Sequence, residues 1–202
     1  KRIIFLLLMF LFLLPSVYLY GQEEFFSKQD GFSFAYLRGV NAPVKADAFG
    51  FSYYSKKGFI TGVGMERAGD VTAPMATLLF CPNWADNLSG FKALIGPSYS
   101  YVSSHHVVGI NVGMVKCFFA ERNFPFSING AFSFQSVLSS QPTLDSKQVP
   151  VMGYGYTQAF FAHSNLYPFI SISNSYNMNS GDQILSLSFG INVKLDAPSA
   201  EK

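Results

Sequence analysis

Charged side chains are scarce in this chain of 202 residues. Asp, Glu, Lys and Arg make up 13% of it, about half of the 25% that is usual for a soluble globular protein. So few charges cannot cover a water-facing surface on a chain in which 49% of the residues are hydrophobic. The formal net charge of +2 also excludes a strongly basic surface for nucleic acid and a strong field for steering charged ligands.

A second long hydrophobic run is missing as well. Beyond the N-terminal segment, no stretch reaches the 18 or so apolar residues that a membrane-spanning helix requires. The N-terminal segment has a basic start, an apolar core from Ile3 to Leu14 and a breaker-containing exit up to Gly21, which is the three-part pattern of a signal peptide. We therefore expect residues 1–21 to be a cleaved signal peptide and residues 22–202 to form one barrel domain with a short C-terminal tail.

Alternation of bulky apolar and small polar residues is abundant instead. From Gln183 to Leu195, Leu, Phe, Ile and Val alternate with Ser, Gly, Asn and Lys. Successive side chains of a strand point to opposite faces, so one face is bulky and apolar while the other is small and polar. A face meant for bulk water normally carries charge. Small uncharged residues therefore predict a crowded, partly wet interior, and the bulky face predicts contact with lipid.

The same alternation recurs in about ten segments separated by turn residues. Each is about 9 to 12 residues long, the length that a tilted strand needs to cross the hydrocarbon layer. The least regular segment runs from about Ala73 to Cys81 and contains Pro74. Because every backbone polar group must be paired in a bilayer, such strands have to close on themselves. The sequence predicts an all-β fold, a closed antiparallel transmembrane β-barrel of about ten strands, with eight as the alternative.

The small polar face supplies the candidates for the lining of the lumen. Ten strands enclose more space than small side chains can fill. The remaining space must hold water, a solute, or chain folded back from Gln22 to Asp30 or from the loop between Leu138 and Gln148. The lumen-lining candidates are Ser98, Asn111, Asn129, Ser133, Gln135, Ser188 and Asn192.

Aromatic residues near the segment ends add a second barrel feature, because transmembrane barrels carry aromatic girdles at both interfaces. Examples are Tyr53, Tyr54, Tyr99, Tyr101, Phe118, Phe119 and Phe124. From Gly31 to Leu195 the chain resembles the small outer-membrane β-barrel proteins of Gram-negative bacteria, in architecture and without a diagnostic motif. The resemblance implies contact with outer-membrane lipid and lipopolysaccharide, and insertion by the outer-membrane assembly machinery. One departure is the tail from Asp196 to Lys202, since such barrels often end in an aromatic residue.

Groups for metal binding are few. Cys81 and Cys117 form no CxxC pair. One strand is expected between them, which separates them by about 9 to 10 Å, beyond the reach of a disulfide unless a loop bends. His105 and His106 are expected in a surface turn, where adjacent residues face opposite ways and do not share a metal ion. We expect no metal and no cofactor.

Groups for catalysis are equally few. Glu66 and Arg67 are expected to be rim charges rather than a catalytic pair. His163, Ser164 and Asn165 invite comparison with the outer-membrane lipid A deacylases, in which one residue separates the His and the Ser. Here they are adjacent, so they do not share a strand face as a nucleophile and base would.

The sequence therefore favours a non-enzymatic barrel. It would serve passive permeation of water or small solutes, or have a structural role in the envelope. One alternative is an accessory barrel that binds another envelope protein within an outer-membrane complex. A second alternative is a lipid A-modifying barrel enzyme.

Overall fold

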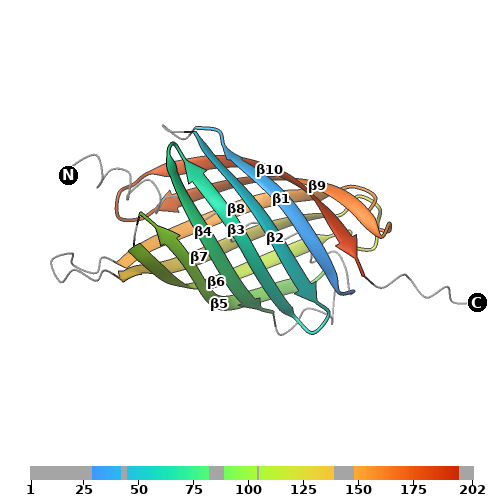
Figure 1. The fold of residues 1–202 in the computed structure, drawn as a ribbon. Helices are drawn as coiled ribbons and strands as arrows, with labels where there is room; N and C mark the ends of the chain where they lie inside the picture. The colour runs from blue at the N-terminus through green and yellow to red at the C-terminus, as the bar shows by residue number, and fades with distance from the viewer. Residues whose placement is uncertain (1–28, 42–44, 82–88, 104, 139–147, 196–202) are drawn as a thin grey trace, which may run out of the picture.

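A computed structural model describes residues 29–41, 45–81, 89–103, 105–138 and 148–195. These residues form ten antiparallel strands that close into one barrel (Figure 1). Each strand pairs with the strands before and after it in the chain, and β1 pairs with β10 to complete the wall. The predicted closed barrel of ten strands is thereby confirmed. The strands are β1 Gly31–Gly39, β2 Ala46–Ser55, β3 Phe59–Ala68, β4 Val71–Phe80, β5 Phe91–Val102, β6 His105–Phe118, β7 Phe126–Leu138, β8 Gln148–Ala159, β9 Leu166–Asn177 and β10 Gln183–Lys194.

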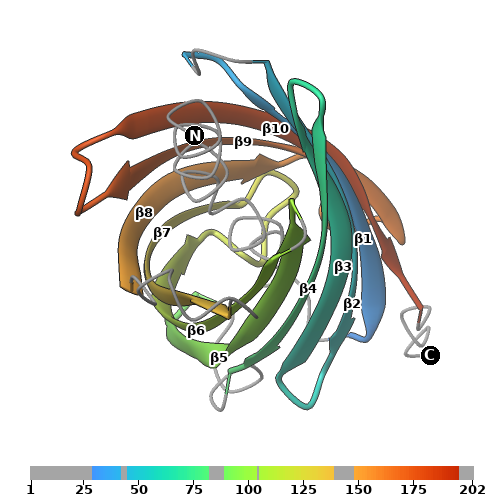
Figure 2. The ribbon, with the colours of Figure 1, turned by 60° about the vertical axis from the view of Figure 1, so that its left-hand side comes forward.

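The wall is more strongly curved around β5 to β8 than along β1 to β4 (Figure 2). We call the end at which β1 begins and β10 ends the terminal rim, and the opposite end the distal rim. Turns at the distal rim include the tight turn at Gly69 and Asp70 between β3 and β4. The described segments include no helix that is long and apolar enough to cross a membrane.

The bulky residues face outward and the small ones face inward. In β10, Leu187 and Phe189 are 46% and 56% exposed, whereas Ser188 between them is 5% exposed. The same division holds in the other strands, where the exposed large hydrophobic residues alternate with buried Ser, Gly, Ala and Asn. The inverted pattern read from the sequence is therefore the pattern of the barrel.

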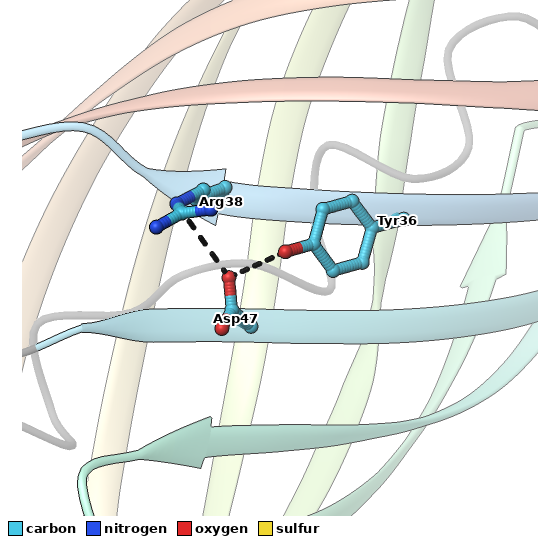
Figure 3. A network of polar contacts seen from close by, with 3 residues as sticks. All are labelled: Tyr36, Arg38 and Asp47. Atoms are coloured by element: carbon cyan, nitrogen blue, oxygen red, sulfur yellow. Dashed lines mark hydrogen bonds and ion pairs between the residues drawn. The ribbon is translucent and has the colours of Figure 1, made fainter.

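Charged residues on the outer face lie close to the rims. Near the distal rim, the Tyr36 hydroxyl donates a 2.6 Å hydrogen bond to Asp47 Oδ1, and Arg38 Nε lies 4.0 Å from the same oxygen (Figure 3). Near the terminal rim, Lys116 Nζ lies 5.0 Å from the ring centroid of Phe91. Among the described residues, the outer face between these positions is uncharged, which is the band that lipid tails require.

Large inward side chains occupy part of the space that was expected from the sequence to hold water, a solute or folded-back chain. Toward the terminal rim, Tyr54, Tyr167, Phe169, Leu79 and Val115 belong to one buried cluster to which seven strands contribute. The physical reason is that ten strands enclose a cross-section that small residues alone leave empty. We call this group the apolar cluster.

The expected position of the histidine pair in a surface turn is also corrected. His105 and His106 are the first two residues of β6 and not part of a turn. The Tyr99 hydroxyl and His106 Nδ1 are 2.7 Å apart, and the Tyr101 and His106 rings are 5.1 Å apart. These contacts across the strand pair extend the β5–β6 ladder to Val102 and His105. Among the described residues between β5 and β6, Ser103 has a positive φ of 46°.

Several predictions fall outside the described residues. They are the signal peptide, the segment from Gln22 to Lys28, most of the loop between Leu138 and Gln148, and the C-terminal tail. These remain predictions.

Candidate functional site: the barrel interior

The seven lumen-lining candidates occupy alternating positions whose side chains point into the barrel. Ser98 belongs to β5, Asn111 to β6, and Asn129, Ser133 and Gln135 to β7, while Ser188 and Asn192 belong to β10. Asn111, Ser133 and Asn192 are 1%, 2% and 0% exposed. The seven do not form a single cluster, since those on β5 to β7 lie apart from those on β10.

Three of the candidates meet at one amide. Ser98 Oγ and Ser133 Oγ donate hydrogen bonds of 3.4 and 3.3 Å to Asn111 Oδ1. The register explains the contact, because Ser98 pairs with Gly109 and Ser133 pairs with Asn111 across neighbouring strands. Asn111 Nδ2 has no hydrogen-bond partner among the described residues. A cavity of about 10 Å³ adjoins Asn111 and Asn129, close to the smallest volume that holds one water molecule.

Other buried polar atoms of the interior share this property. Both side-chain atoms of Asn192, the Ser127 hydroxyl and Glu66 Oε1 are buried without a hydrogen-bond partner in the described part of the chain. A buried polar atom left in this way costs about 1 to 3 kcal/mol. Such atoms are generally hydrogen-bonded to the protein or to water, so these positions call for water or a polar solute.

Glu66 is the functional candidate that sequence reasoning missed. It lies two residues before the end of β3 at the distal rim, where it is 4% exposed and points inward, so it is a buried group of the interior and not an exposed rim charge. Its neighbour Arg67 is exposed and donates to the Gly69 carbonyl oxygen at 3.1 Å. The alternation of side chains along the strand could have revealed it in the sequence, because Glu66 shares the inward face of β3 with Gly62 and Gly64.

Two lysines of the interior lie toward the opposite end of the barrel from Glu66. Lys92 points inward from the start of β5 and is 1% exposed. Lys194 closes β10, where its Nζ donates to the Ala162 carbonyl oxygen and lies 5.3 Å from the Tyr167 ring. Both cations therefore lie toward the terminal rim, whereas the Glu66 carboxylate lies toward the distal rim.

In the part of the chain that the structure describes, the candidate metal-binding and catalytic groups lie apart. Cys81 and Cys117 are buried in the apolar cluster and are not joined by a disulfide. Among the described residues, no three His, Cys, Asp or Glu side chains are grouped to hold a metal ion. His163 and Ser164 are exposed in the turn between β8 and β9, where Ser164 donates its backbone N–H to the Phe161 carbonyl oxygen.

Several solved structures are similar to this chain at low sequence identity. The NanC porin has a TM-score of 0.50 and 8% identity, and the match covers 81% of this chain and all of that one. The KdgM porin has a TM-score of 0.47 and 11% identity over 81% of this chain and 99% of its own. Neisserial surface protein A has a TM-score of 0.40 and 13% identity over 84% of this chain and 98% of its own. No protein-family model and no curated protein matches the chain. The expected resemblance to small outer-membrane β-barrels is confirmed for the architecture.

Proposed function

We propose that the protein is a non-enzymatic barrel of the Gram-negative outer membrane through which water and small polar solutes pass. Its outer face would contact outer-membrane lipid and lipopolysaccharide, and the outer-membrane assembly machinery would insert it. The uncharged band between the Tyr36–Asp47 pair and Lys116 supports this location. The NanC protein, whose fold is similar, is described as a porin.

The main support for permeation is a set of buried polar atoms that have no hydrogen-bond partner among the described residues. Asn192, Asn111, Ser127 and Glu66 place such atoms at several levels of the interior. A packed, dry core would leave each of them at a cost of about 1 to 3 kcal/mol. A file of water or polar solute along the interior removes that cost, because each atom then gains a hydrogen bond.

Liposome swelling tests the proposal with one inward and one outward change on the same strand. Asn192→Leu replaces the amide by an apolar group and is expected to slow swelling in glycerol, since the solute loses a hydrogen-bonding position. The matched variant Ile191→Leu changes the lipid face and is expected to swell like the wild type. Equal swelling of the two variants, or no swelling of the wild type, would contradict permeation.

The apolar cluster favours a second candidate function. Tyr54, Tyr167 and Phe169 fill part of the interior toward the terminal rim. A cluster that excludes water there would argue against permeation and leave the accessory role, in which the barrel binds another envelope protein. A pull-down in mild detergent with identification of the bound proteins tests this candidate. A wild type that fails to swell liposomes and retains one stoichiometric envelope partner would support it over permeation.

A further inference from the structure

The seam between β4 and β5 differs from the other nine strand pairs. Its register joins Phe80 to Ile95 and then resumes at Thr77 and Ser98. The two positions between them have no paired partner in the ladder, although the register places Leu78 opposite Pro97. Proline has no backbone N–H and cannot complete a ladder hydrogen bond. The wall is therefore interrupted in the middle of a strand pair.

Pairing at this seam also ends early toward the distal rim. The last joined positions are Met75 and Ser100, so the first four residues of β4 have no partner on β5. By contrast, β5 and β6 are joined along the whole of β5. A barrel in lipid normally closes every ladder, because unpaired backbone groups are costly there. The gap marks this seam as the weakest closure of the wall.

The wall is thin where the ladder is interrupted. Gly96 lacks a side chain, and a Cβ atom placed there would lie 1.9 Å from the Leu78 carbonyl oxygen. Gly109 likewise adds no side chain to the inner face on β6, and Ala76 adds only a methyl group to the outer face of β4. Gly96 and Gly109 leave the inner face of β5 and β6 without side chains here, while Leu79 of the apolar cluster points inward beside them from β4.

A largely apolar groove of about 790 Å³ is lined by residues of β4, β5, β6 and β7 around this seam, and its volume is within the range of small-molecule sites. Its outer lining includes Leu78, Tyr99, Ile110 and Phe134, which belong to the lipid-facing set. Its lining also includes Thr77 and Ser98 from the inward-facing set. Ser98 Oγ donates to Asn111 inside the barrel, and Thr77 Oγ1 donates across the seam to the Pro97 carbonyl oxygen at 3.3 Å.

We propose that the β4–β5 seam is a lateral passage through which a single-chain amphiphile, such as a fatty acid, moves between the lipid phase and the lumen. The apolar outer lining of the groove accommodates the chain. The hydroxyls of Thr77 and Ser98 provide hydrogen-bonding groups for its head where the groove reaches the inward-facing row. The proposal deepens the proposed permeation function, on which it rests, by naming a route and a solute class.

A reversible cross-link tests the passage. Ala76 and Tyr99 are register partners across the seam, and paired strand positions bring Cα atoms within disulfide reach. The variant Ala76→Cys/Tyr99→Cys, made with Cys81→Ser and Cys117→Ser, closes the seam when oxidised and releases it when reduced. The control Phe51→Cys/Val63→Cys staples the fully paired β2–β3 ladder. Met75 and Ser100 are also register partners across the seam, so Met75→Cys/Ser100→Cys, which leaves Thr77 and Ser98 intact, is the second pair, for use if the first does not fold or oxidise.

The readout is photolabelling by a dodecanoic acid with a terminal diazirine, incorporated into liposomes that contain the protein. We expect labelling of Asn111 and its inward neighbours in the reduced protein, and a several-fold loss of this labelling when the seam is stapled. Labelling of outward Ile110 should persist, and the β2–β3 staple should change neither. Inward labelling that is absent, or that is unaffected by the seam staple, overturns the lateral passage. Glycerol swelling is measured on the same samples and is expected to be insensitive to the staple, so that a failure of axial permeation is recognised separately.

Discussion

Ile110 and Gln183 both lie on the outer face, at different depths. Ile110 is 58% exposed in the middle of β6, and Gln183 begins β10 at the distal rim. An arginine on the lipid face of a barrel costs about 2 to 4 kcal/mol at the midplane and about 0 to 1 near the interface. We expect Ile110→Arg to lower the unfolding free energy by the larger amount and Gln183→Arg by the smaller one, as measured by urea titration in phospholipid vesicles. Phe132→Arg should resemble Ile110→Arg.

The inward face is less tolerant of arginine than the sequence alone indicates. Ser133 is expected from the sequence to accept Arg more readily than Ile110 does. In the structure it is 2% exposed and donates to Asn111, so the introduced side chain would also need space. For this reason the rim position Gln183 is the cleaner control. If Ile110→Arg proved as benign as Gln183→Arg, the assignment of the lipid face would be wrong.

The Tyr36 hydroxyl supplies a second prediction on single residues. It donates a 2.6 Å hydrogen bond to Asp47, whereas Arg38 Nε is 4.0 Å from the same oxygen and its side chain is 57% exposed. A hydrogen bond contributes about 0.5 to 1.5 kcal/mol, and an exposed ion pair contributes less. A double-mutant cycle of Tyr36→Phe with Asp47→Ala should therefore give a larger coupling than Arg38→Gln with Asp47→Ala. The reverse order would place the stabilisation in the ion pair.

At the scale of elements, the contact between β4 and β5 constrains Gly96. Its Cβ position lies 1.9 Å from the Leu78 carbonyl oxygen, whereas that of the inward-facing Gly153 lies 3.7 Å from the nearest atom. Overpacking of this kind costs about 1 to 3 kcal/mol. We expect Gly96→Ala to lower the urea midpoint of unfolding and Gly153→Ala to leave it nearly unchanged. Similar midpoints would show that the two strands separate at little cost.

Strand positions could be read from the sequence because each buried face repeats with a period of two residues. The irregular segment with Pro74 is a strand all the same, since neighbouring β3 pairs with it from Phe59 to Ala68. The early start of β6 could not be read, because it depends on the contact of His106 with Tyr99 and Tyr101. The local sequence contains the partners of that contact but not the register that joins them.

For the whole molecule, the sequence indicates which residues face inward but not how the interior is filled. The alternation of side chains along each strand places Asn111, Asn192 and Glu66 on the inner face. Their lack of partners depends on which side chains meet across the barrel, which in turn depends on the register of every strand pair. The apolar cluster was missed for the same reason, since Tyr54, Tyr167 and Phe169 come together from β2 and β9. Closure of the barrel brings these residues into one cross-section.

The charges of the interior predict the ion preference of any conductance. Glu66 lies toward the distal rim, and Lys92 and Lys194 lie toward the terminal rim. Charges of opposite sign along one path have opposing effects on ion preference, so we expect weak selectivity in the wild type.

Glu66→Gln removes the carboxylate and leaves the two ammonium groups, which favours anions. The expected result is a shift of the reversal potential toward anion selectivity in planar bilayers under a salt gradient, at an alkaline pH that keeps the carboxylate ionised. Glu121→Gln is the matched control, because Glu121 is exposed in the turn between β6 and β7 and lies outside the path. A reversal potential that responds equally to both variants would locate the ion path elsewhere than beside Glu66.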